Sequence, residues 1–131
     1  MNIKHILLLA MLAFGMAAPA QTYVGSMTTD GYTRRDVTAR LQRQGNRATI
    51  LIFNTKFARM MPVKVDVEIP EVVVDSTALR CRQVVPSSNG KPYPKYTVRN
   101  LRGTADGRSL RFSCTMGDKQ VTYTGTLTQK Q

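Results

Sequence analysis

Hydrophobic and polar residues alternate along most of the sequence after residue 20, and this alternation restricts the chain to β structure. The clearest segment is 63–69, in which valine and isoleucine alternate with charged residues (V-K-V-D-V-E-I). The same period of two recurs in 37–42, 48–52, 110–116 and 121–127. Because successive side chains of a strand point to opposite faces, the pattern predicts antiparallel strands with one face buried and one in water.

Turn residues separate the alternating segments, as at Gln44-Gly45-Asn46 and Gly117-Asp118. Short strands in close succession favour an all-β meander that closes into an eight-stranded antiparallel up-and-down barrel, which leaves no exposed edge. An immunoglobulin-like sandwich is the alternative, although the chain lacks the tryptophan commonly buried there. Composition predicts a surface loop at 86–92, and a helical turn is expected at Phe57–Met61. We expect the strands at 22–28, 35–44, 47–55, 62–69, 77–85, 95–101, 108–116 and 119–128.

The first 20 residues have the features of a cleavable signal peptide. Lys4 precedes an apolar run from Ile6 to Ala18, and Ala18-Pro19-Ala20 supplies the small residues of a cleavage site. A membrane anchor is the alternative, but the run is shorter than the roughly 20 residues that span a bilayer. We therefore expect a signal peptide at 1–20 and one β-barrel domain at 21–131. The mature protein is expected to lack a transmembrane segment and to reside in the periplasm or outside the cell.

The composition of the mature chain argues against an enzyme. Cleavage would remove His5, the only histidine, which excludes Ser/His/Asp and Cys/His catalysis and histidine metal sites. We therefore expect no catalytic residues, no metal and no cofactor. Loss of Lys4 would lower the net charge from +11 to +10. The positive charge favours an anionic partner, but export and the shortage of aromatic residues for base stacking argue against nucleic acid.

Cys81 and Cys114 are the only cysteines, and an oxidising compartment favours a disulfide between them. Such a bond would close a loop of 34 residues and add roughly 3–4 kcal/mol of stability in the chain-entropy model. The alternative is two buried free thiols that act as small apolar residues.

The segment 57–70 (F-A-R-M-M-P-V-K-V-D-V-E-I-P) resembles the middle of the calycin-like, lipocalin-like barrels that bacteria secrete. The ends of the mature chain agree with this resemblance, because Tyr23-Val24-Gly25 and Tyr123-Thr124-Gly125 match the Tyr-x-Gly strands at the ends of such proteins. The resemblance covers the mature length and implies an eight-stranded antiparallel barrel in the cell envelope or outside it. It implies no particular ligand, and the Gly-x-Trp motif of true lipocalins is absent.

The alternation identifies a candidate ligand site inside the barrel. An eight-stranded barrel has an interior that side chains either fill or leave open for one small ligand. A small apolar or amphipathic molecule is the candidate ligand, and a filled core is the alternative. The Phe57–Met61 turn is expected to plug one end of the barrel, and a lid or a contact surface for a partner is the alternative. The residues expected to point inward are Ile50, Ile52, Val65, Val67, Phe112, Met116 and Tyr123.

Arginines on three successive strands form the second candidate site. In a meander these strands lie side by side, so their outward arginines would form one positive flank. Guanidinium groups bind carboxylate, sulfate or phosphate through two hydrogen bonds, and the candidate partners are an anionic polysaccharide, a lipid headgroup or an acidic protein. The alternative is a solvated surface that only confers solubility. The candidate residues are Arg80, Arg82, Arg99, Arg102, Arg108 and Arg111.

These features predict an exported, non-enzymatic binding protein. It would hold a small ligand in the barrel mouth or an anionic partner on the arginine flank. The alternative is a structural or inhibitory envelope protein that acts through protein–protein contacts. An open interior would favour the ligand carrier, whereas a filled interior with an exposed patch would favour an interaction module.

Overall fold

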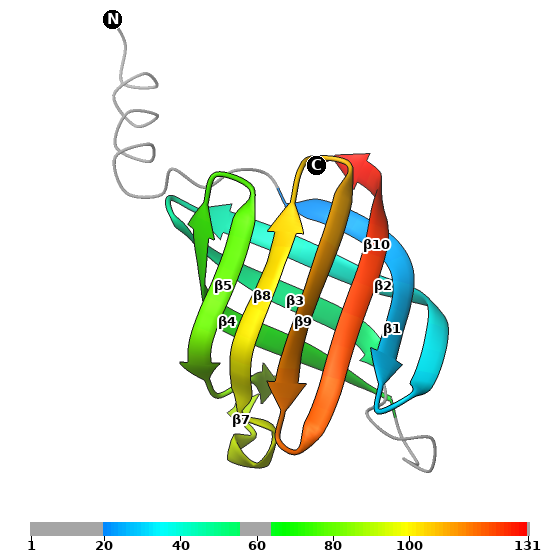
Figure 1. Ribbon diagram of the computed structural model, residues 1–131, viewed down its shortest axis with the longest axis vertical. Helices are drawn as coiled ribbons and strands as arrows, with labels where there is room; N and C mark the ends of the chain where they lie inside the picture. Colours follow the sequence, from blue (N-terminus) through cyan, green and yellow to red (C-terminus); the bar gives the residue numbers. More distant parts are fainter. Residues whose placement is uncertain (1–19, 56–63, 131) are drawn as a thin grey trace, which may run out of the picture.

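The computed structural model describes residues 20–55 and 64–130, which form an all-β fold (Figure 1). The barrel strands are β1 (Gln21–Thr29), β2 (Tyr32–Gln44), β3 (Arg47–Thr55), β4 (Val65–Asp75), β5 (Ala78–Val84), β8 (Val98–Ala105), β9 (Ser109–Met116) and β10 (Lys119–Lys130). Between β5 and β8 the chain forms a small hairpin, β6 (Ser87–Ser88) and β7 (Lys91–Pro92), and a 3-10 turn, η1 (Pro94–Tyr96).

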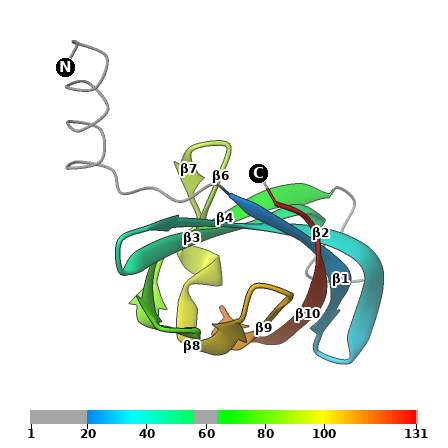
Figure 2. The same cartoon turned by 90° about the horizontal axis from the view of Figure 1, so that it is seen from above.

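The eight long strands pair antiparallel with their neighbours in chain order, and β1 pairs with β10 to join the first and last of them. The sheet is therefore a closed up-and-down barrel, and Figure 2 shows its strands as a ring. This confirms the predicted architecture and rules out the sandwich. The helical turn predicted at 57–61 and the signal peptide, except its last residue, lie outside the described residues.

Several predicted boundaries were wrong near β4 and β8. β4 continues past Pro70 to Asp75, because the proline lies in a register shift of the β3–β4 ladder, between Ile69 and Val72, and on a stretch that makes no ladder pair with β5. Glu71, next to the proline, has a positive φ of 62°. The strand predicted from residue 95 begins at Val98, after η1. The segment 86–92, expected to be a loop, contains the β6–β7 hairpin.

The two Tyr-x-Gly motifs lie on adjacent strands, where Gly25 of β1 is the cross-strand partner of Gly125 of β10. A Cβ atom on Gly25 would lie 1.9 Å from the Thr124 carbonyl oxygen, so this close approach requires glycine. The Tyr123 ring lies against the Cα of Gly125, and its hydroxyl donates a 2.9 Å hydrogen bond to the carbonyl of Val37. The glycines thus make room for a tyrosine that links β10 to β2 across β1.

The predicted disulfide is wrong, because Cys81 and Cys114 are free thiols in the structure. Cys81 lies on β5 and Cys114 on β9, with β8 between them. Two strand spacings separate their backbones by about 9–10 Å, beyond the roughly 7 Å that a disulfide can bridge between Cα atoms. Both side chains are buried among apolar residues, which is the alternative left open by the sequence.

Candidate functional site

Four of the six candidate arginines lie together on the outer face of β5, β8 and β9, which are neighbours in the front wall of Figure 1. We call this group the arginine face: Arg80 and Arg82 on β5, Arg102 on β8 and Arg111 on β9. All four side chains are exposed. Arg80 and Arg102 are direct cross-strand partners, which places their Cβ atoms about 5 Å apart.

The remaining two candidate arginines lie away from this group. Arg99 is opposite Gln83 and Thr115, near the end of the barrel that carries the β6–β7 hairpin. Arg108 lies in the β8–β9 turn at the other end. That turn is organised by Asp106, whose carboxylate accepts hydrogen bonds from the backbone N–H groups of Arg108 and Ser109. These bonds lower the pKa of the Asp106 carboxyl.

The arginine face borders two shallow hollows that share Arg102. The first, of about 460 Å³, is lined by Arg80, Arg82, Arg102, Asn100 and Val73, and we call it the arginine hollow. The second, of about 430 Å³, we call the hydroxyl hollow. It extends across β8, β9 and β10 and is lined by Arg102 and Arg111 together with the hydroxyl-bearing residues Thr104, Ser113, Thr122 and Thr124.

The positive charge of the arginine face is not balanced by neighbouring carboxylates. Within residues 20–55 and 64–130 the ion pairs are Arg47–Glu71 at 3.8 Å and Lys119–Asp30 at 3.9 Å, and neither includes an arginine of this face. Like charges placed directly opposite each other on a sheet destabilise it. The Arg80–Arg102 pair therefore costs stability unless an anion binds between the two guanidinium groups.

The sequence analysis missed Arg47 as a neighbour of this face. Arg47 of β3 pairs with Val73 of β4, and Val73 pairs in turn with Arg80 of β5. One row across four strands therefore carries Arg47, Val73, Arg80 and Arg102. The sequence pattern did not indicate that Arg47 lies near the arginine face, because 33 positions separate Arg47 from Arg80 in the chain and only the pairing of β3 with β4 brings them together.

All seven residues predicted to point inward do so, but most are packed into the core. Ile50, Ile52, Phe112 and Tyr123 have at most 2 % of their surface exposed, and the Phe112 and Tyr123 rings stack with centroids 5.5 Å apart. Other large side chains, including Met27 from β1, share this core. The remaining three, Val65, Val67 and Met116, border a pocket at one end.

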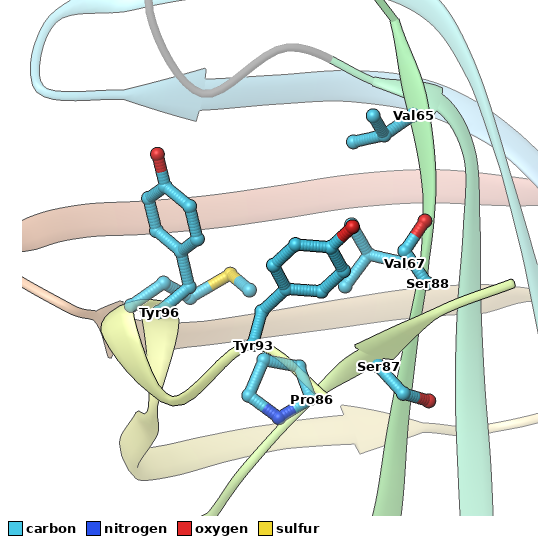
Figure 3. A pocket seen from close by; sticks show the side chains of 8 residues that line it. Val65, Val67, Pro86, Ser87, Ser88, Tyr93 and Tyr96 are labelled. Carbon is cyan, nitrogen blue, oxygen red and sulfur yellow. The ribbon is translucent and has the colours of Figure 1, made fainter. Parts of the chain in front are cut away.

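This mouth pocket, of about 90 Å³, lies where the β6–β7 hairpin and η1 fold back against β4 (Figure 3). Tyr93, 42 % exposed, directs its ring across the pocket toward Val67 and Ser88, and Tyr96 lies on the other side. The hairpin is held by the pairing of Ser87 with Glu68. The rest of the lining is Val65, Pro86 and Met116.

Burial controls the titration of two core groups near the arginine strands. It raises the pKa of the Cys114 thiol to about 12, with a smaller contribution from Cys81. Burial also raises the pKa of the Tyr123 hydroxyl, with a smaller contribution from Tyr23. Both groups are therefore protonated at neutral pH. Their environment disfavours the anionic forms that nucleophilic chemistry would require.

The described part of the chain contains no helix long and apolar enough to cross a membrane. No group of three acidic, cysteine or histidine side chains that could hold a metal ion occurs within residues 20–55 and 64–130. No protein-family model, curated protein or solved structure matches the chain.

Proposed function

We propose that the protein is an exported, non-enzymatic binding protein that holds a polyanion on the arginine face. The observation that carries this proposal is the direct pairing of Arg80 with Arg102, with no carboxylate of the described residues within 4.0 Å of either. An anion bound between the two guanidinium groups would relieve their repulsion and could accept two hydrogen bonds from each guanidinium group.

The test is binding to immobilised heparin, a generic linear polyanion. The double variant Arg80→Gln/Arg102→Gln removes two charges from the face, and Arg35→Gln/Lys91→Gln removes the same charge from exposed sites elsewhere. We expect the first variant to weaken heparin binding at least about tenfold. The slope of log affinity against log salt concentration should also become shallower by about two, because two fewer counterions are released on binding. The control should change affinity by less than about threefold. Equal losses in both variants would show that only net charge matters.

Export and family membership are part of the same proposal. We propose cleavage before Gln21, delivery to the periplasm or the cell exterior, and membership of the calycin-like barrels. The closed eight-stranded barrel and its paired Tyr-x-Gly strands support the last of these. Mass spectrometry of protein secreted by its own host should find Gln21 as the N-terminus. An intact Met1 on the secreted protein would contradict the signal peptide.

A second candidate function is binding of a small apolar or amphipathic ligand in the mouth pocket. Its support is the apolar lining and the exposed ring of Tyr93 at the opening. Aromatic rings stack well on tyrosine, and a methionine sulfur contacts ring edges favourably. The pocket is smaller than the roughly 150 Å³ cavity that encloses benzene, so a bound ring would stay partly exposed.

Titration with p-cresol, followed by amide NMR shifts, tests this candidate. Saturable shifts at Val65, Val67 and Ser88 are expected, and Tyr93→Ala should weaken them. Val85→Ala, which trims an exposed apolar residue outside the pocket lining, is the matched control. Shifts that remain linear in p-cresol concentration, or that both variants change equally, would refute a site in the mouth pocket.

A further inference from the structure

The two hollows form one continuous surface, because Arg102 lines both of them. In the arginine hollow the polar groups are guanidinium groups and the amide of Asn100. In the hydroxyl hollow the guanidinium groups of Arg102 and Arg111 lie among the hydroxyls of Thr104, Ser113, Thr122 and Thr124. Along a direction that crosses the strands, the surface therefore changes from a part whose polar groups are guanidinium groups and one amide to a part where two guanidinium groups lie among hydroxyls. A ligand that fits both parts carries anionic groups and neutral polar groups in the same chain.

The pairing register sets the spacing of these groups. Arg102 is opposite Ser113, and Ser113 is opposite Thr122. Two residues further along these strands, on the same face, Thr104 is opposite Arg111, and Arg111 is opposite Thr124. Adjacent strands lie about 4.8 Å apart, and alternate residues along a strand lie about 6.7 Å apart. The groups are therefore presented at steps close to the length of one residue of an extended sugar chain.

From these observations we infer that the polyanion is an acidic polysaccharide that lies across β5, β8, β9 and β10. Its carboxylate or sulfate groups bind Arg80, Arg82, Arg102 and Arg111. Its neutral sugar hydroxyls exchange hydrogen bonds with Ser113, Thr122 and Thr124. This inference rests on the proposed polyanion binding and adds to it the sugar as a recognised group. A lipid phosphate or a bare polyphosphate would use the arginines and leave the hydroxyls of Thr122 and Thr124 without a sugar partner.

The experiment compares two linear polyanions, a heparin-derived hexasaccharide and a polyphosphate of similar charge, which has no sugar. The variant Thr122→Val/Thr124→Val removes two hydroxyls of the hydroxyl hollow and keeps the side-chain shape and the β-propensity. Thr38→Val/Thr49→Val on β2 and β3, on the opposite wall of the ring in Figure 2, is the matched control. Dissociation constants of both ligands are measured calorimetrically for each variant.

We expect Thr122→Val/Thr124→Val to weaken hexasaccharide binding roughly tenfold, as the loss of two hydrogen bonds predicts, and polyphosphate binding less than about twofold. The control should change neither. Unchanged hexasaccharide binding would refute the sugar contact while leaving the arginine face intact. Equal weakening of both ligands would refute sugar recognition as well, because it would show a general anion effect. Failure of Arg80→Gln/Arg102→Gln to weaken either ligand would instead refute the proposed function.

A measurement on the unaltered protein keeps the inference falsifiable if the threonine variant folds poorly. Saturating hexasaccharide should shift the amide resonance of Thr122, whereas polyphosphate should shift those of Arg80 and Arg102 and leave Thr122, one strand further away, nearly unchanged. The same set of shifted amides with both ligands would overturn the assignment of the hydroxyl hollow to a sugar.

Discussion

Replacement of Tyr123 by phenylalanine isolates one buried hydrogen bond in the barrel. The Tyr123 side chain is fully buried, and its hydroxyl donates to the Val37 carbonyl at 2.9 Å across β1. Tyr123→Phe keeps the ring and its stacking on Phe112 but leaves the Val37 carbonyl without this donor. A buried acceptor that loses its partner costs about 1–3 kcal/mol. In a domain of this size, the loss corresponds to a decrease in melting temperature of roughly 4–13 °C.

Tyr23 offers the matched control, since it occupies the equivalent place in the other Tyr-x-Gly motif. Its hydroxyl donates to the Gln21 side chain at 3.0 Å, and Gln21 is only half-buried at the start of β1. Water can replace that contact, so Tyr23→Phe should cost less than about 1 kcal/mol.

Urea unfolding followed by circular dichroism measures both variants, and an unchanged m-value would show that the folded and unfolded states keep their compactness. The reasoning predicts a larger loss of unfolding free energy for Tyr123→Phe than for Tyr23→Phe. Equal losses, or a loss below about 0.5 kcal/mol for Tyr123→Phe, would refute the cross-barrel role of the Tyr123 hydroxyl.

Three further predictions concern charge and titration. Cys114 of the native protein should not react with a thiol reagent at about pH 8, because a pKa of about 12 lowers its thiolate fraction roughly a thousandfold relative to an ordinary thiol. Denatured, non-reduced protein should then release two thiols, and a mass lower by two hydrogens would instead reveal a bond to Cys81. Asp106→Ala should destabilise the protein near neutral pH. Because folding lowers the pKa of Asp106, its carboxylate stabilises the fold at pH values above the pKa that it has in the unfolded chain. This stability is lost as the pH falls through the lowered pKa of the folded protein, so the wild type and the variant should become equally stable in acid. Arg80→Gln should raise stability by about 0.2–1 kcal/mol at low salt by removing the repulsion from Arg102, and thermal unfolding in high salt should abolish the gain; a gain that survives high salt would contradict this explanation.

The period-two pattern predicted most of the barrel because it reports a local property, namely which side of a strand faces the core. Ile50, Ile52 and Phe112 were placed inside on that basis, and the structure buries them. The same reasoning placed Arg80 and Arg102 on adjacent outer faces, where they are direct partners.

Features that depend on distant pairing could not be predicted in the same way. The disulfide prediction conflicted with the predicted topology, because an up-and-down order of the strands 77–85, 95–101 and 108–116 already places one strand between Cys81 and Cys114, as the structure has it. The mouth pocket depends on the pairing of Ser87 with Glu68, which holds the hairpin against β4, whereas composition alone predicts that segment to be a loop. The strand predicted at 62–69 continues past Pro70, because β4 accommodates the proline at a register shift with β3 and where no β5 ladder pair is made.

The single pairing of Glu68 with Ser87 makes the β6–β7 hairpin an appendage of the barrel rather than a part of its closed ring. The eight long strands close without it, so the chain between β5 and β8 can change in length and composition with little effect on the ladder that defines the fold. This protein therefore offers a natural grafting position. A foreign recognition loop that replaces the hairpin would stand at the mouth of the barrel, while the arginine face on the wall would remain as it is.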